Sequence, residues 1–365
     1  WACTVACGRG RSEVIDGRQI AQGALLADGG FAYVYRGTDS RTGEAIAIRR
    51  ALCQDGETRR AAREEIGLLE GLPPHQHIVR FLGGEIVEVG RGGSAEAVSL
   101  WELCTGGTLV AALQAAMDAA TPSKRDAGGI CCPCLVEAEV LKVLGSTASA
   151  LEHLHHHGIV HYDVKSENLM LGADDRWKLG DFGSASRRTF NLAGAARAQV
   201  LEAEEFVSGR CTPMYRAPEA ADVYLRWTIG PKADIFALGC VLFATLTGAH
   251  PFPQESQLAN VQANFKLPPA MASEYARAFE TWLLRLLARE PADRPDAADL
   301  VLEVQRFRSS RQDPPFRTER REDRPEDFGG AERRASELRA RGGAGAEWRA
   351  EFPSPFSADF GSGRQ

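Results

Sequence analysis

Four polar side chains in one short segment have the types and the spacing to carry out chemistry. Residues 160–183, VHYDVKSENLMLGADDRWKLGDFG, contain Asp163, Lys165, Asn168 and Asp181. A carboxylate can accept a proton from a reacting hydroxyl, and carboxylate and amide oxygens are the ligands that Mg²⁺ prefers. An Asp-Phe-Gly sequence alone would more often be a turn, and a lone lysine a solvated charge. The assignment therefore depends on the rest of the chain.

The surrounding sequence predicts a strand-rich half followed by a helical half. Alternating apolar residues predict strands from about residue 17 to 50, with a turn at Asp28, Gly29 and Gly30. A hinge is expected near residues 102–107. Further strands are predicted at 78–89 and 97–103, and helices at 58–72, 108–119, 136–156, 232–246 and 276–288.

Composition limits the classes of protein. The chain has 365 residues, of which 44% are hydrophobic and 25% charged, as in a globular protein of one large or two ordinary domains. The net charge of −6 gives no reason to expect a nucleic-acid partner. The longest apolar run, residues 235–246, is too short to span a membrane. Because the sequence begins with Trp1, we expect a fragment, whose targeting signals could lie upstream.

Cysteine and histidine clusters leave metal sites open as alternatives. Nine cysteines do not make a disulfide scaffold in a chain of this length, and one cluster is formed by Cys131, Cys132 and Cys134. No second ligand pair at metal spacing follows, which favours a plain loop over a zinc site. Five of the eight histidines lie between His153 and His161. We favour a helix end there, with His161 packing and hydrogen-bonding to hold the following loop.

Taken in order, these motifs resemble those of eukaryotic protein kinases. LADGGFAYV (26–34) resembles the glycine loop, residues 160–183 contain a catalytic loop and a metal-binding motif, and APE follows at 217–219. The resemblance covers roughly residues 18–305. It implies an α+β, two-lobed protein-kinase fold. We expect three parts: a lead-in at 1–17, a kinase domain at 18–307 and a disordered charged tail at 308–365. Within the kinase domain, residues 18–103 would form a small lobe of antiparallel β-sheet with one main helix. Residues 108–307 would form a larger, mainly helical lobe.

The resemblance implies ATP and Mg²⁺ as cofactors and gives each candidate residue a role. Asp163 would accept the proton of the substrate hydroxyl, and Lys165 would reach the transferred phosphate. Asn168 and Asp181 would hold Mg²⁺. Glu65 would pair with the residue at the position of the family's strand lysine. The other implied residues of the ATP site are Ala27, Gly29, Gly30, Val34, Ala47, Arg49, Glu102, Cys104 and Met170.

Further residues resemble those of serine/threonine kinases. In that class a threonine such as Thr212, in CTPMYRAPE, bridges the base and the lysine, here Lys165. Glu219 is expected to form a buried ion pair with Arg294, and Asp234 to fix the backbone of the catalytic loop. The implied substrates are proteins with serine or threonine hydroxyls.

A narrower resemblance is to the Numb-associated kinase group, which includes adaptor-associated and cyclin-G-associated kinases. It is carried by LADGGFAYVY, DFGSAS, YRAPEAADVY and NFKLPP, with Ala27 and Ala32 flanking the glycine loop. Because this group acts in clathrin-adaptor trafficking, the resemblance implies a cytoplasmic protein. DPPF (313–316) and FPSPFSADF (352–360) could dock on endocytic adaptor domains, although random occurrence explains them at least as well.

Three residues depart from the family pattern. Arg49 stands where the strand lysine is expected, and the small lobe contains no lysine. Arginine keeps the positive charge, but its forked guanidinium group is wider and longer than the ammonium group of lysine. Tyr162 replaces the arginine that normally holds a phosphate on the activation loop, so we expect no dependence on phosphorylation there. Trp101, just before the hinge, either fills the core or narrows the pocket behind adenine.

Two functions from different classes follow. The favoured one is a serine/threonine protein kinase whose activity is reduced by Arg49, because the base and the metal ligands are intact. The alternative is a pseudokinase, a nucleotide-binding or scaffold module in trafficking or signalling, which Arg49 and Tyr162 favour.

Overall fold

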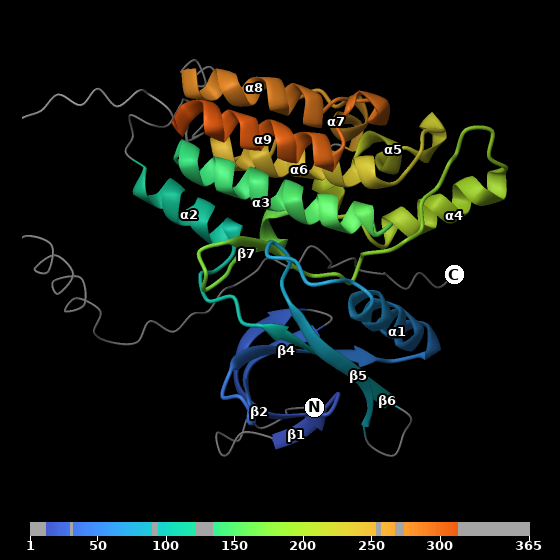
Figure 1. Cartoon of the computed structure of the whole chain (residues 1–365). Coiled ribbons are helices and arrows are strands. Elements are labelled where there is room, and N and C mark those ends of the chain that lie inside the picture. Colours follow the sequence, from blue (N-terminus) through green and yellow to red (C-terminus); the bar gives the residue numbers. More distant parts are fainter. Residues whose placement is uncertain are drawn as a thin grey trace, which may run out of the picture. The chain divides into compact units, whose positions relative to one another are not determined.

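One antiparallel sheet forms the framework of the small lobe (Figure 1). The computed structural model describes residues 12–29, 32–89, 94–120, 134–252, 257–266 and 274–312. The order of the strands across the sheet is β1-β2-β3-β4-β6-β5. They are β1 (Ser12–Ile15), β2 (Arg18–Gly29), β3 (Ala32–Asp39), β4 (Ala45–Cys53), β5 (Phe81–Val89) and β6 (Ser94–Glu102).

The alternation of side chains along β4 decides what faces the large lobe. Ile46 and Ile48 are buried in the core of the small lobe. Because successive side chains of a strand point to opposite faces, Ala47 and Arg49 share the other face. Ala47 packs against a hydrophobic cluster that extends from Leu69 and Trp101 of the small lobe into the large lobe. The strand therefore places Arg49 on the face that meets the large lobe.

Helix α1 (Gly56–Glu70) carries the second polar group of the small lobe. A capping box starts it: the side chain of Asp55 accepts a hydrogen bond from the backbone N–H of Thr58 at 2.8 Å, and the Thr58 hydroxyl accepts one from Asp55 at 3.2 Å. The helix packs against β5 and β4. This packing brings Glu65 to the strand that carries Arg49.

The large lobe is built around a buried helix. Every residue from Ala233 to Thr247 of α6 is buried, with α3 and α8 packed against it, which confirms the core helix predicted there. A short hairpin of β7 (Leu169–Leu171) and β8 (Trp177–Leu179) adjoins the catalytic loop. The helices are α2 (Leu109–Ala119), α3 (Glu137–His156), α4 (Arg197–Ser208), α5 (Pro218–Ala221), α6 (Pro231–Thr247), α7 (Gln257–Gln262), α8 (Glu274–Leu286) and α9 (Ala297–Gln312).

Hydrogen bonds join the two lobes on either side of the hinge. The backbone N–H of Val79 donates to Leu179 at 2.9 Å, and that of Leu179 donates to His77 at 2.9 Å. Beyond the hinge, the N–H of Gly106 donates to Leu171 at 2.9 Å. The same β7–β8 hairpin therefore receives both connections and fixes the lobes around the catalytic loop.

Three sequence-based expectations need correction. Asp28 and Gly29 pair with Tyr33 and Ala32, so β2 continues through the first two residues of the predicted turn. Helix α4 was not predicted at all. Helix α9 runs to Gln312, past the expected start of the tail at residue 308, and Arg308 donates to the carbonyl of Leu141 at 2.8 Å.

Several expectations fall on residues that the structure does not describe. They are residues 1–11, Gly30, Cys131, Cys132, positions 267–269 of NFKLPP, and the tail from 313 on with its two Phe-containing motifs. Within the described ranges, no cluster of three or more His, Cys, Asp or Glu side chains could hold a metal ion. None of the helices in those ranges is long and apolar enough to cross a membrane.

The buried ion pair predicted between Glu219 and Arg294 is present. Both side chains are fully buried, and Nη1 and Nη2 of Arg294 donate to the two carboxylate oxygens at 2.7 and 2.8 Å. Further hydrogen bonds from Arg294 reach Ala288, Arg289 and Lys232. The guanidinium therefore ties helix α5 to the loop before α9.

Removing one member of this pair leaves an uncompensated buried charge. We expect Arg294→Met to lower the free energy of unfolding by about 3–5 kcal/mol, measured by urea denaturation. The double variant with Glu219→Gln should lose less than Arg294→Met alone, because the buried carboxylate is gone. A loss below about 1 kcal/mol, as for an exposed pair, would contradict the prediction.

Candidate active site

One buried carboxylate positions the backbone of the catalytic loop. Oδ2 of Asp234 accepts the N–H of His161 at 2.9 Å, and Oδ1 accepts that of Tyr162 at 2.8 Å. Tyr162 has φ = 64°, a strained conformation for a large side chain that needs such support. The prediction that Asp234 fixes this backbone is confirmed. His161 is fully buried and contacts Gly180 O through Nε2 at 3.2 Å, so the predicted loop-holding histidine is also confirmed.

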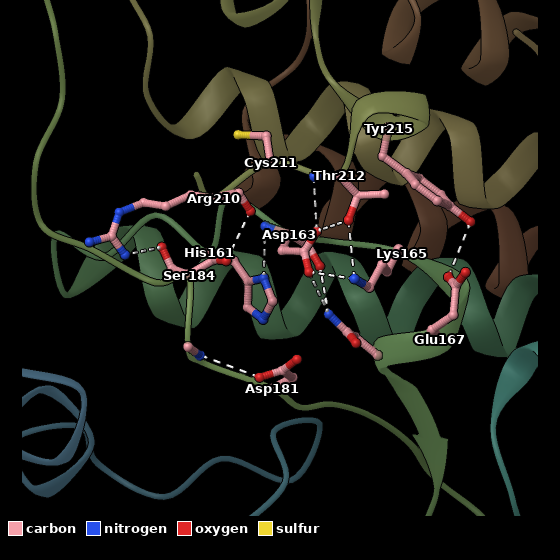
Figure 2. Close-up of polar contacts among 12 residues, drawn as sticks. His161, Asp163, Lys165, Glu167, Asp181, Ser184, Arg210, Cys211, Thr212 and Tyr215 are labelled. Carbon is pink, nitrogen blue, oxygen red and sulfur yellow. Dashed lines mark hydrogen bonds and ion pairs between the residues drawn. The ribbon is translucent and has the colours of Figure 1, made fainter. Parts of the chain in front are cut away.

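Asp163, Lys165 and Thr212 meet in one cluster (Figure 2). The hydroxyl of Thr212 donates to Oδ1 of Asp163 at 2.5 Å, and Nζ of Lys165 lies 2.7 Å from Oδ2. Nζ also donates to the Thr212 hydroxyl at 3.1 Å, so this oxygen bridges the two charged groups as predicted. Charge-assisted hydrogen bonds of this kind are the strong ones. The carboxylate is therefore held in one orientation.

Asn168 and Asp181 lie on adjoining segments. The amide nitrogen of Asn168 donates to the carbonyl of Asp163 at 2.8 Å, which turns its carbonyl oxygen away from that residue. The N–H of Gly180, just before Asp181, donates to the backbone oxygen of Asn168 at 2.9 Å. Asp181 is exposed, and Gly183 donates to its carboxylate at 3.4 Å. An amide oxygen and a carboxylate on tethered segments are a donor set that fits Mg²⁺.

Arg49 connects the sheet, helix α1 and the Asp-Phe-Gly segment. Its Nη1 donates to both carboxylate oxygens of Glu65, at 3.0 and 3.2 Å. Its Nη2 lies near Gly183: a Cβ atom added to this glycine would be 3.5 Å from that nitrogen. Burial alone would lower the pKa of Arg49, but the carboxylates of Glu65 and Asp181 raise it on balance. The positive charge is therefore kept at the site.

Three of the side chains expected around adenine pack on one hydrophobic cluster that contains residues of both lobes. Val34 is paired with Ala27 in β2 and with Arg49 in β4. Ala47, Cys104 and Met170 all pack on that cluster. Glu102, by contrast, uses its side chain elsewhere. Its carboxylate accepts the N–H of Arg80 and pairs with Lys178, each at 2.7 Å. Burial, with a contribution from Glu102, raises the pKa of the Cys104 thiol to about 11.

Trp101 is buried, which agrees with the first of its two suggested roles, that of a core filler. Its ring lies parallel to that of Phe182 of the Asp-Phe-Gly segment, with 6.1 Å between centroids, and edge-on to Phe81 at 5.1 Å. Its Nε1 donates to Ser99 at 2.9 Å, which fixes the ring. The indole is thus part of the buried core, and Trp101 pairs with Ala47 across β4 and β6.

Sequence reasoning missed the groups that order the activation segment. The Tyr162 hydroxyl donates to the carbonyl of Arg188 at 2.5 Å, and its ring packs edge-on against Phe206 of α4. The guanidinium groups of Arg188 and Arg210 lie over the same Phe206 ring, at 5.1 and 4.6 Å from its centroid. The buried positions 200, 203, 206 and 207 have helical spacing, a signal that could have revealed α4.

His155 was also missed. Its Nε2 lies 2.9 Å from Oδ2 of Asp234, the oxygen that accepts the N–H of His161. The sequence showed this histidine only as one of a run, and its partner is 79 residues away. It supplies a further polar contact to the carboxylate that holds the catalytic loop.

Comparison with known proteins agrees with this geometry. The sequence model of the protein kinase domain matches residues 20–304. Two probable serine/threonine-protein kinases of Dictyostelium discoideum are similar to the chain. One is 28% identical over 78% of this chain and 24% of its own length. The other is 30% identical over 81% of this chain and 35% of its own length. Serine/threonine-protein kinase 16 of Rattus norvegicus is 27% identical, over 82% of this chain and 93% of its own.

The chain spans about a quarter to a third of the length of the first curated relatives it matches. The domain match nevertheless covers most of the present chain, and it includes the catalytic loop, Arg49 and the buried Glu219–Arg294 pair. The chain therefore belongs to the protein kinase family.

Proposed function

We propose that this chain transfers the γ-phosphate of ATP to serine or threonine hydroxyls of proteins. The observation that supports this most is the cluster of Asp163, Lys165 and Thr212, in which the threonine hydroxyl touches both charged groups. A carboxylate held in this way is oriented to receive a proton from an incoming hydroxyl. The serine/threonine kinases among the relatives support the same class of substrate.

The residues divide the work of transfer as follows. Asp163 orients the substrate hydroxyl and accepts its proton, while the cation of Lys165 stabilises charge on the transferred phosphoryl group. Asn168 and Asp181 are the side chains that would hold Mg²⁺. When bound, Mg²⁺ neutralises charge on the phosphates. We assign the ATP site to Ala27, Gly29, Gly30, Val34, Ala47, Arg49, Glu65, Glu102, Cys104 and Met170.

Arg49 would make this a slower kinase than its relatives with a strand lysine. Its guanidinium is committed on one arm to Glu65, and the other arm points to Gly183. A planar fork cannot present the compact point charge that a lysine offers to phosphates. The retained charge and the intact Glu65 pair favour reduced activity over none.

The second candidate is a pseudokinase that binds nucleotide or serves as a scaffold. Two observations favour it: Arg49 at the strand-lysine position, and Tyr162 in an apolar cluster at the position where a phosphate-binding arginine is usual. The intact base and metal ligands oppose it, so we place it second.

The finer assignments rest on sequence similarity. We propose membership of the Numb-associated group and a cytoplasmic role in clathrin-adaptor trafficking, with the two Phe-containing tail motifs as candidates for binding adaptor domains. We place the kinase domain at about residues 18–307, extended by strand β1 before it and by the end of helix α9 after it, and the family match covers 20–304.

The proposed chemistry predicts the effect of two substitutions on phosphate transfer. With labelled ATP, Mg²⁺ and myelin basic protein, the full chain should transfer phosphate, and Asp163→Asn should lower kcat by about 10²- to 10⁴-fold. Arg49→Lys should raise kcat/KM for ATP by up to about 10²-fold, because it restores a compact charge.

Arg60→Lys is the matched control, because Arg60 is an exposed residue of α1 that lies 4.0 Å from Glu64. It should change nothing. Parent transfer that survives Asp163→Asn would overturn the proposed base. If neither the parent nor Arg49→Lys transfers phosphate, the pseudokinase function is the correct one.

The ordering of the activation segment by Tyr162 predicts that activity does not need phosphorylation there. Burial raises the pKa of the Tyr162 hydroxyl, so it stays protonated and keeps donating to Arg188. Complete dephosphorylation by a phosphatase, checked by mass spectrometry, should leave kcat within about twofold. A fall of tenfold or more, restored when the chain is rephosphorylated, would show that the prediction is wrong.

A further inference from the structure

A groove lies next to the activation segment and includes none of the residues of the proposed ATP site. It encloses about 380 Å³ between the C-terminal end of α4, residues 216–224 and α7. Figure 1 shows α4, α5 and α7 at the same end of the large lobe, and α5 packs directly against α7. No residue placed in the proposed chemistry lines it, so it needs another explanation.

The groove is apolar in its floor and at its rim. Val207, Ala220 and Val223 line it and are buried. Two large apolar side chains at its edge stay in solvent: Tyr224 is 59% exposed and Leu258 is 62% exposed. Exposed apolar residues that gather around a hollow typically mark a binding surface.

The charges at the groove are negative on balance. Glu204 and Asp222 line it, and Glu205 is next to it in α4. In the part of the chain that the structure describes, no ion pair engages these three carboxylates, whereas Glu202 of the same helix is held by Arg188. One basic residue, Arg216, also lines the groove and donates to the carbonyl of Cys211 at 2.8 Å, so its single positive charge is outnumbered by the carboxylates. Charge complementarity therefore favours a basic occupant.

The groove is built on the segment that carries Thr212. Asn260 of α7 is buried, and its Nδ2 donates to the carbonyls of Pro213, Met214 and Arg216 at 3.3, 3.0 and 2.9 Å. These contacts fix α7, with Leu258, to the chain just after Thr212. A protein bound in the groove would therefore lie beside the segment that contacts Asp163.

We propose that this groove docks a segment of the protein substrate in which a large apolar side chain is flanked by lysine or arginine, remote from the hydroxyl that receives phosphate. The apolar side chain packs between Val223 and Leu258, and the basic residues pair with Glu204 and Asp222. Docking raises the local concentration of the acceptor hydroxyl, so it lowers KM without changing kcat. The predicted effect on KM rests on the proposed kinase function. Binding in the groove can be measured without phosphate transfer.

The kinetic test uses the full chain with myelin basic protein, a basic substrate, and an eight-residue serine peptide without large apolar residues. Leu258→Glu should raise KM for myelin basic protein about tenfold and leave kcat, and all constants for the peptide, unchanged. The matched control is Leu302→Glu in α9, since Leu302 is 50% exposed and lies outside the groove. It should have no effect on either substrate.

Charge reversal and direct binding complete the test. Glu204→Lys should also raise KM for myelin basic protein, and it should lower KM for the acidic substrate dephosphorylated casein. Calorimetric titration of myelin basic protein should give about tenfold weaker binding to Leu258→Glu. Because this measurement needs no phosphate transfer, it decides the docking proposal even if the chain proves to be a pseudokinase.

Three outcomes would overturn the proposal. The first is no binding of myelin basic protein to the parent chain. The second is an equal loss with Leu258→Glu and Leu302→Glu. The third is a parent dimer in sedimentation that Leu258→Glu converts to monomer without affecting substrate, which would make a second copy the occupant.

Discussion

The carboxylate of Asp234 is the constraint on which the candidate active site depends. It is 1% exposed and accepts hydrogen bonds from two successive N–H groups, those of His161 and Tyr162, while His155 contacts it from α3. These contacts hold Tyr162 in a left-handed conformation, and that turn sets the direction in which Asp163 leaves the backbone. The buried helix α6 supplies Asp234. The packing of the large lobe therefore fixes the position of the Asp163 carboxylate.

The remaining charged groups are arranged around this fixed point in two different ways. On the large-lobe side, Tyr162 and the arginine–aromatic contacts of Phe206 replace the phosphate-binding arginine that the family usually has, so the segment is ordered by groups already in the chain. On the small-lobe side, Arg49 keeps the ion pair with Glu65 but changes the shape of the cation offered to phosphates. Tyr162 thus contacts the segment directly, and Arg49 keeps its positive charge beside Glu65.

The sequence predicted the contacts that the kinase motifs imply and missed contacts that lie outside those motifs. Asp163, Lys165 and Thr212 were expected to meet because the resemblance to serine/threonine kinases implies it, although Thr212 is 49 residues from Asp163. The buried Glu219–Arg294 pair was expected on the same ground. The contacts of Tyr162 with Arg188 and Phe206 could not be predicted, because they require helix α4 to fold back onto the catalytic loop. The turn expected at Asp28 failed because pairing with β3 extends β2 beyond what glycine content suggests.

The most direct test of this account is the turnover of Asp234→Asn, measured together with its affinity for Mg-ATP and its melting temperature. An asparagine can accept only one of the two N–H groups, so Asp163 should shift while the nucleotide site stays intact. We expect kcat to fall by about 10²-fold, as for a small misplacement of a catalytic group. The affinity for Mg-ATP should not change. An unchanged kcat in the folded variant would contradict the claim that this carboxylate positions the base.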